Sequence, residues 1–323
     1  MNSSSPQRLT VNAIMLATLT AILWGGNPVA TRYSVDDIPP VLAAGLRFLI
    51  GAIFMIAWCR VEGSPIRLRR KDVIPCAITG LLLFVQIGLF NVGVHRSTTS
   101  HSSLFINTFV FWVIAFEHFI THEDRLTVRK SVGLMLAAGG VLALMVSTER
   151  VETGSVSRDA PTLVGDVILC VSALILGIKV IYTKHALKVV APGTLVFWQS
   201  VLGTICFFAW SLGFERKETG PVGIPAMLGI LYQGVFVAGV CFALQARLIR
   251  EYSATQISIF AFLTPLAGVV GGVLLRGDVV SPWLLVAAGG ITGGIVCVNW
   301  RERPIDHLSP APVESAAEGT GID

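Results

Sequence analysis

Apolar runs of about 20 residues, separated by short polar segments, recur along the chain from residue 11 to residue 300. A helix of about 20 apolar residues crosses the hydrocarbon core of a bilayer. The runs are 11–31, 39–59, 73–94, 99–120, 131–148, 163–183, 193–213, 223–245, 255–275 and 281–300. The pattern therefore predicts an all-α integral membrane fold with ten transmembrane helices, and it leaves no room for a large soluble domain.

The second half of the chain repeats the first half. An offset of 154 residues matches Asn91 with Gln245, Arg96 with Arg250, Asp124 with Asp278, and Gly139-Gly140 with Gly293-Gly294. Each copy holds five spans, and an odd number of spans inserts the second copy upside down relative to the first. We therefore expect two inverted five-helix repeats, at 11–148 and 163–300, an architecture typical of secondary transporters.

Composition and charge agree with this interpretation. Hydrophobic residues make up 53% of the chain and charged residues only 14%, with a mean hydropathy of +0.73, which lies outside the range of soluble domains. Lys and Arg mark cytoplasmic loops, and with the N-terminus inside, fifteen of them fall on the inner side and seven on the outer side. Both termini are therefore expected in the cytoplasm. No basic surface indicates nucleic-acid binding, and the polar tail at 301–323 is expected to be disordered.

Short motifs distributed over the two halves carry a family resemblance. They are Leu23-Trp24-Gly25-Gly26-Asn27-Pro28-Val29-Ala30, Leu46-Arg47-Phe48, Asp124-Arg125-Leu126-Thr127, Gly165-Asp166 and Leu263-Thr264-Pro265. In order, spacing and duplication they resemble the two tandem EamA-type halves of the drug/metabolite transporter superfamily, over about residues 11–300. The resemblance implies ten helices, a central cavity for small metabolites such as amino acids or drugs, and an exporter in the inner or plasma membrane that works by alternating access.

The chain departs from the family pattern at two places. Asp124 and Asp278 stand in the loops before spans 5 and 10, where the family usually has Glu. Phe111 stands in span 4 where the family usually has Pro, and its counterpart in span 9 is Pro265. Proline removes a backbone hydrogen bond and bends a helix. We therefore expect span 4 to be less kinked than in the family, and the cavity to differ in shape.

Polar residues inside the predicted spans are the candidates for a substrate site, because each costs a few kcal/mol if it faces lipid. Aligning 23–27 with 175–179 matches Lys179 of span 6 with Asn27 of span 1. We expect the two side chains to flank the midplane of the bilayer, where transporters with inverted repeats bind their substrates. The alternative is that Lys179 reaches the inner membrane surface, about one helical turn away.

Gly25, Gly26 and Pro28 surround Asn27 and weaken span 1, since Gly lowers helix propensity and Pro removes a donor. Carbonyl groups freed by this break are available to a substrate ammonium. The alternative is that the glycine pair only allows close packing between helices. Both interpretations stay open at the level of the sequence.

Arg47 of span 2 aligns with Gln199 of span 7. We expect Arg47 to bond carbonyl oxygens of span 1 as a structural anchor, and direct contact with a substrate is the less favoured alternative. The remaining candidates for substrate contact are amides and aromatic residues, whose alternative role is contact between helices: Asn91, Gln245, Gln86, Gln233, Trp24 and Trp112.

Two other classes of function remain open. His118 and His122 lie one helical turn apart and can hold a metal in a membrane-embedded metal-dependent enzyme, although a polar inner end of span 4 also explains the pair. A non-transporting membrane receptor or scaffold is the other class. The sequence shows no catalytic motif, metal set or cofactor motif, and its six cysteines are expected to be packing residues. The expected partners are a small-molecule substrate and the lipid bilayer, and a homodimer stays open.

Overall fold

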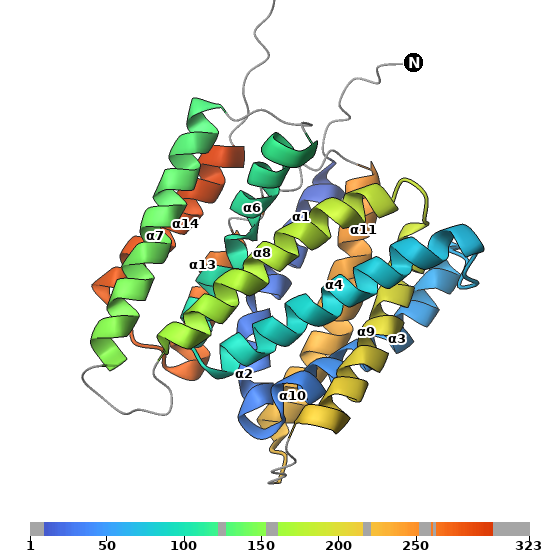
Figure 1. The fold of residues 1–323 in the computed structure, drawn as a ribbon, viewed down its shortest axis with the longest axis horizontal. Coiled ribbons are helices and arrows are strands. Elements are labelled where there is room, and N and C mark those ends of the chain that lie inside the picture. Colours follow the sequence, from blue (N-terminus) through green and yellow to red (C-terminus); the bar gives the residue numbers. More distant parts are fainter. Residues whose placement is uncertain are drawn as a thin grey trace, which may run out of the picture.

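The computed structural model describes residues 10–121, 127–152, 161–215, 221–251, 260 and 263–299. These residues form helices and no strand, and the helices are arranged as a bundle of tilted rods (Figure 1). Eight helical stretches among them are long and apolar enough to cross a membrane, and two shorter apolar helices cover Leu263–Arg276 and Pro282–Cys297. The prediction of an all-helical membrane fold is confirmed.

The helices follow the predicted spans. In the first half they are α1 (Val11–Gly25), α2 (Asn27–Asp37), α3 (Pro40–Glu62), α4 (Arg70–His95), α5 (Thr99–Asn107), α6 (Phe109–Phe116) and α7 (Val128–Glu152). In the second half they are α8 (Leu163–Ala186), α9 (Pro192–Phe214), α10 (Ile224–Tyr232), α11 (Phe242–Glu251), α13 (Leu263–Arg276) and α14 (Pro282–Asn299). Two π-helical segments, η1 (Glu117–Thr121) and η2 (Gln233–Cys241), continue α6 and α10.

Proline and threonine determine where several of these helices begin. Pro40 and Pro192 lie in the first turns of α3 and α9, where the missing N–H group has no helical partner to lose. Thr10 and Thr162 cap α1 and α8 by accepting hydrogen bonds of 3.2 and 3.0 Å from backbone N–H groups. The same residue types therefore begin both members of each helix pair, 152 residues apart in the sequence.

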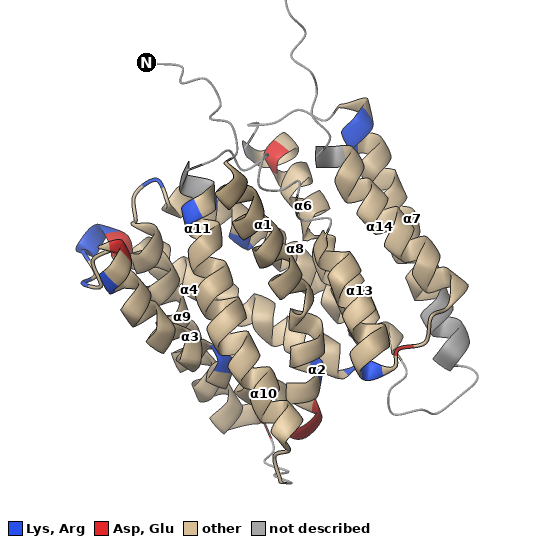
Figure 2. Ribbon diagram, turned by 180° about the vertical axis from the view of Figure 1, so that it is seen from behind, with Lys and Arg blue, Asp and Glu red and all other residues tan. Residues whose placement is uncertain are grey.

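Most of the long helices pack on partners from the other half of the chain. α3 lies against α9, α4 against α8, α2 against α10, and α1 against α13. α7 and α14 pair at one edge of the bundle, where Figures 1 and 2 both show them side by side. The halves therefore share their cores. Phe48, Leu83 and Phe207, for example, come from α3, α4 and α9 and form one fully buried cluster.

The two ends of the bundle carry different polar contacts. At one end, which we call the Asp166 end, α4 finishes, α5 and α8 begin, and Thr162 Oγ1 donates to the carbonyl oxygen of Arg96 (2.7 Å). At the opposite end, the Glu117 end, α8 finishes and Lys184 Nζ bonds Glu117 Oε1 of η1 at 2.9 Å. Figure 2 shows that charged residues gather toward the ends, whereas most of the middle of the bundle is uncharged.

The first predicted span is interrupted at its glycine pair. α1 ends at Gly25, α2 begins one residue after Gly26, and Pro28 lies buried in the first turn of α2. A Cβ on Gly25 would lie 2.5 Å from Cβ of Ala267 in α13, and one on Gly26 would lie 2.5 Å from Oη of Tyr232 in α10. Both glycines therefore stand where neighbouring helices approach closely, as the packing interpretation requires.

The fourth predicted span is also interrupted, at Thr108 between α5 and α6. That Phe111, in place of proline, makes this span less kinked than in the family stays a prediction. At the interruption, Thr108 Oγ1 donates to the carbonyl of Phe105 (2.6 Å) and Asn107 Nδ2 donates to that of Ser103 (2.7 Å). Such bonds from a side chain to the preceding turn compete with the helical pattern and bend helices.

Gly165, in the first turn of α8, tests how closely that helix approaches the end of α4. A Cβ at this position would overlap the backbone carbonyl of Arg96, which cannot swing aside as a flexible side chain does. We expect Gly165→Ala to destabilise the purified protein by about 1–3 kcal/mol, the usual cost of overpacking, and to lower its apparent melting temperature. Gly88→Ala in α4 is the matched control, because a Cβ there meets nothing within 4 Å. Equal melting temperatures for Gly165→Ala and the wild type would contradict this close approach.

Candidate functional site

The candidate site is built around the ring of Phe242, the first residue of α11. Lys179 Nζ of α8 lies 5.0 Å from the centre of this ring, within the range of a cation–π contact. Trp24 of α1 meets the same ring edge-on at 6.1 Å between centres, and Phe48 of α3 stacks on it at 6.4 Å. Four helices, two from each half of the chain, therefore converge on one aromatic side chain.

Arg47 of α3 lies beside this cluster, with its guanidinium carbon 5.0 Å from the centre of the Phe48 ring. Arg47 is 2% exposed, and its Nε and Nη1 have no hydrogen-bond partner among the described residues. The expectation that Arg47 anchors span 1 through carbonyl oxygens is wrong, because no hydrogen bond joins these nitrogens to α1 or α2. Packing among apolar neighbours holds the guanidinium in place and leaves two of its nitrogens unsatisfied.

Lys179 also lies inside the bundle and is 5% exposed. Its side chain lies over Phe242 of α11, whereas the next lysine of the helix, Lys184, is the one that reaches the Glu117 end. Within the described ranges, no hydrogen bond or ion pair joins Lys179 to another residue. Lys179 and Arg47 lie over two stacked rings, Phe242 and Phe48, whose centres are 6.4 Å apart. The site therefore contains two buried cations and no carboxylate paired with either of them.

Asn27, which the repeat matches to Lys179, is the first residue of α2, directly after the helix break. Its Oδ1 is enclosed and has no hydrogen-bond partner in the part of the chain that the structure describes. The carbonyl of Leu23, just before the break, accepts a hydrogen bond from Tyr232 Oη at 2.6 Å. The carbonyl of Leu23 therefore bonds a hydroxyl of the protein and not a substrate ammonium. The amide oxygen of Asn27 is the group at the break that has no hydrogen-bond partner among the described residues.

Two of the predicted amides, Gln233 and Gln86, form hydrogen bonds between helices. Gln233 of η2 accepts from Thr31 Oγ1 (3.0 Å) and donates to Ser34 Oγ (2.8 Å), both on α2. Gln86 of α4 donates to Ser172 Oγ of α8 (3.2 Å), and its backbone carbonyl accepts from that hydroxyl in return. These contacts match the helix-joining alternative for both residues.

The other two amides keep capacity for a further partner. Asn91 Nδ2 donates to the carbonyl of Pro40 (2.9 Å), whereas its buried Oδ1 has no partner among the described residues. Gln245 is half-buried on α11, and no hydrogen bond joins it to another described residue. They are the amides that remain as candidates for substrate contact.

The last two predicted residues make packing contacts between helices. Trp112 stacks on Phe116 with ring centres 6.3 Å apart, lies against Gly177 of α8, and is 40% exposed. Pro265 is buried near the start of α13, and its carbonyl accepts a hydrogen bond from Ser103 Oγ of α5 (3.4 Å). Trp112 therefore packs α6 on α8, and Pro265 joins α13 to α5.

The residues proposed for a metal lie at the Glu117 end. His118 is part of η1, and its ring meets that of Phe119 edge-on at 4.7 Å. His122 and the neighbouring Asp124 fall outside the described residues. Where the structure describes the chain, it contains no group of three His, Cys, Asp or Glu side chains that could hold a metal ion. All six cysteines are free.

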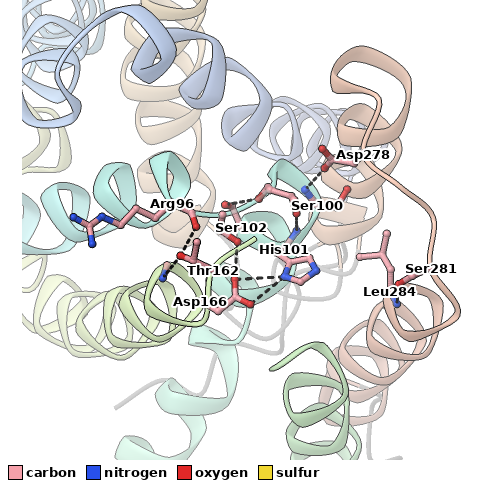
Figure 3. Close-up of polar contacts among 12 residues, drawn as sticks. Arg96, Ser100, His101, Ser102, Thr162, Asp166, Asp278, Ser281 and Leu284 are labelled. Carbon is pink, nitrogen blue, oxygen red and sulfur yellow. Dashed lines mark hydrogen bonds and ion pairs between the residues drawn. The ribbon is translucent and has the colours of Figure 1, made fainter. Parts of the chain in front are cut away.

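A buried polar network at the Asp166 end is not evident from the sequence (Figure 3). Asp166 Oδ1 accepts from Ser97 Oγ (2.6 Å), and its Oδ2 lies 3.1 Å from His101 Nδ1 of α5. Asp278 Oδ2, after α13, accepts from the backbone N–H of Ser100 at 2.6 Å. The sequence signal for this network is modest: a run of Thr, Ser and His opens span 4, and one Asp lies in the first turn of span 6. The network ties α5 to both α8 and the segment after α13.

Arg32 belongs to the same end and is another residue whose role the sequence does not reveal. Charge counting assigns it to an outer loop, whereas the structure places it in α2 at 7% exposure. Its Nη1 donates to the carbonyls of Val94, His95 and Ser97 at 2.9, 2.8 and 3.2 Å. Arg32 therefore satisfies carbonyl groups that the C-terminus of α4 leaves without helical partners.

Comparison with known proteins identifies the same pattern. The EamA-like transporter family matches the chain at residues 11–146 and 163–300. The S-adenosylmethionine/S-adenosylhomocysteine transporter of Chlamydia muridarum is 25% identical over 298 residues, covering 90% of this chain and 92% of that protein. The probable amino-acid metabolite efflux pump of Escherichia coli K12 is 24% identical over 313 residues, covering 89% and 96%. A solved crystal structure has the same fold, with a TM-score of 0.65, 20% identity, and coverage of 90% and 98%.

These matches extend over nearly the whole length of the relatives, and the relatives are transporters. Together with the apolar helices, they show a multi-pass protein of the plasma membrane that transports a small molecule. This agrees with a protein that is not an enzyme. Because the two matched segments cover most of the sequence, the chain belongs to the EamA-like transporter family.

Proposed function

We propose that the protein is a secondary transporter that moves small organic metabolites across the plasma membrane by alternating access. The observation that carries this proposal is a group of enclosed polar atoms with no partner among the described residues, Asn27 Oδ1 and Arg47 Nε and Nη1, together with the buried Lys179, whose Nζ lies over the ring of Phe242. They come from α2, α3 and α8, and so from both halves of the chain. A buried polar group without a partner costs about 1–3 kcal/mol. A bound substrate that satisfies these groups accounts for their presence.

The bundle is proposed to contain ten spans in two inverted five-helix repeats, 11–148 and 163–300. Separate matches of the family to each half support this arrangement. Helix packing supports it as well. The contact of span 1 with span 8 (α2–α10) corresponds to the contact of span 6 with span 3 (α8–α4), and the contact of span 1 with span 9 (α1–α13) corresponds to that of span 6 with span 4 (α8–α6). In this arrangement α13 and α14 belong to spans 9 and 10, and both termini lie in the cytoplasm.

The Asp166 end then faces outward, and its polar network is proposed to be the external gate. Asp166 is completely buried, and its bonds to Ser97 and His101 hold α8 against the segment that joins α4 to α5. The described ion pair at the Glu117 end is more open, since the side chains of Lys184 and Glu117 are 38% and 18% exposed. These contacts support a state closed to the outside, in which the bonds of Asp166 break before that end opens.

Amino-acid derivatives are the proposed substrates, and export is the proposed direction. The names of the relatives support this substrate class and direction. One relative is a probable amino-acid metabolite efflux pump, and the other transports S-adenosylmethionine and S-adenosylhomocysteine. The site agrees with such compounds, because the rings of Trp24, Phe48 and Phe242 offer an apolar wall beside polar groups. Aromatic surfaces bind the apolar part of a ligand, and a few polar groups fix its orientation.

Flux from liposomes tests this function. Vesicles containing the purified protein and loaded with a mixture of amino acids and their N-acetyl derivatives should release at least one compound faster than protein-free vesicles. Mass spectrometry of the external medium measures all compounds at once. Identical release from both kinds of vesicle, for every compound, would contradict transport of this substrate class.

Cysteine labelling tests the orientation of the repeats. In a variant without the six native cysteines, a membrane-impermeant maleimide added to intact cells should label Asp278→Cys. Asp124→Cys should react only after the membrane is permeabilised, because the two loops lie on opposite sides of inverted repeats. If both positions react from the same side, the repeats are not inverted.

The same reagent tests the external gate. Ser100→Cys, at a position buried beside the Asp166 network, should react slowly from outside. Adding Asp166→Asn should raise its labelling rate several-fold, because a neutral amide holds His101 and Ser97 less strongly than a carboxylate. Asp37→Asn is the matched control, since Asp37 at the same end bonds only the backbone N–H of Gly223 in the described structure. An unchanged labelling rate in the Asp166 variant would show that this network does not keep the end closed.

A further inference from the structure

Two positive side chains inside the bundle have no acidic partner among the residues that the structure describes. Arg47 and Lys179 are buried at 2% and 5% exposure. The guanidinium of Arg47 keeps its charge in protein environments. Ion pairs described elsewhere in the structure lie near the ends of the bundle, where Asp36 pairs with Arg276 and Glu117 with Lys184, and they leave both of these cations aside.

The placement of the two cations makes this lack of a partner unfavourable. Two positive charges that lie over the stacked rings of Phe48 and Phe242 repel each other, and burial removes the water that would screen them. The rings of Phe48 and Phe242 compensate in part, each at 5.0 Å from a cation. A ring face attracts a cation but cannot replace the oxygen acceptors that guanidinium and ammonium groups need.

Neighbouring side chains do not supply those acceptors. Cys241 of η2, directly before Phe242 in the chain, donates its Sγ–H to the carbonyl of Thr20 at 3.8 Å. Gln199 of α9, which the repeat matches to Arg47, has an enclosed Oε1 without a partner in the described chain, so it does not bond the guanidinium. Cys241 and Gln199 therefore do not act as hydrogen-bond acceptors for the two cations.

We infer that the substrate carries an anionic oxygen group, a carboxylate or a phosphate, which binds between Arg47 and Lys179. The apolar or aromatic part of the same molecule then lies against Phe242 and Trp24. The inference rests on the proposed function and narrows its substrate to organic anions and zwitterions. A neutral or purely cationic compound leaves both positive groups unsatisfied and is excluded by the same argument.

Matched compounds in the liposome assay test the inference. The probes are N-acetylphenylalanine, phenyl phosphate, free phenylalanine, and N-acetylphenylalaninamide, which keeps the ring and loses the negative charge. We expect release of at least one of the first three compounds to exceed release of the neutral amide by tenfold or more, after subtraction of release from protein-free vesicles. Comparison of N-acetylphenylalanine with phenyl phosphate shows which anionic group the site prefers.

Substitutions of Lys179 and Arg47 test whether these two side chains bind the transported anion. Lys179→Met and Arg47→Gln should each reduce release of the transported anion at least tenfold, whereas Lys179→Arg and Arg47→Lys, which keep the charge, should retain part of it. The transported anion should raise the melting temperature of the wild type, because it binds the folded protein, and should not raise that of Lys179→Met. Lys184→Met is the matched control on α8, since Lys184 already has Glu117 as a partner, and it should keep the flux.

Melting temperature without ligand separates a binding role from a structural one. Lys179→Met should melt at the same temperature as the wild type or higher, because the variant removes an unpaired buried charge. Equal release of the neutral amide and the anions, or full flux in both Lys179→Met and Arg47→Gln, overturns the inference and leaves transport itself standing. Release of none of the probes, or of the amino acids in the larger mixture, contradicts the proposed function as well.

Discussion

Burial of positive charge without a protein anion is the constraint on which the rest of this structure depends. A charged side chain at the centre of a membrane helix costs about 2.5–3.5 kcal/mol on insertion scales, and here two of them lie near one another. Arg47 has two enclosed nitrogens without acceptors, and Lys179 has only a cation–π contact among the described residues. A protein gains nothing in stability from such an arrangement. On the inference drawn above, it gains a place where an anionic ligand binds.

Several buried polar groups elsewhere in the bundle have partners, although others, such as Thr99 Oγ1 and Thr292 Oγ1, have none among the described residues. Gln233 is fully engaged with α2, Arg32 bonds three carbonyl oxygens at the end of α4, and Asp166 accepts from Ser97 and faces His101. Close packing at Gly25 and Gly165 brings the helices near enough for these bonds to form. The groups left open at the centre, such as Asn27 Oδ1, are therefore not the product of a loosely packed bundle.

The fold was predictable because hydropathy reports the environment of a whole helix. Each described helix overlaps a predicted span, although more than half of α2 and of α11 extends beyond residues 31 and 245. The break at Gly26 follows from local backbone preferences that residue type alone determines. The interior position of Lys179 followed from the repeat, because a match to Asn27 places it relative to the other half. Such a prediction needs only the sequence and the topology.

Side-chain partners were not predictable to the same degree, because they depend on how each helix is rotated against its neighbours. Arg47 was expected to bond carbonyl groups of span 1 and instead lies beside Phe48 without acceptors. The interruption of span 4 at Thr108 involves a side-chain bond to the carbonyl of Phe105, which the pattern of hydrophobic residues does not reveal. Asp166 and His101 are 65 residues apart in the sequence, and no periodicity connects them.

Supplying the missing anion within the protein tests the central claim most directly. Cys241→Asp places a carboxylate at a fully buried position directly before Phe242, the ring that Lys179 contacts. If Arg47 and Lys179 bind the anionic group of the substrate, this variant should melt at a higher temperature than the wild type, and its flux of the transported anion should fall at least tenfold. Cys59→Asp, buried in α3 beside the negative charge of Glu62, should instead lower the melting temperature. If Cys241→Asp lowers the melting temperature as Cys59→Asp does and keeps full flux, the site does not bind its substrate through an anionic group.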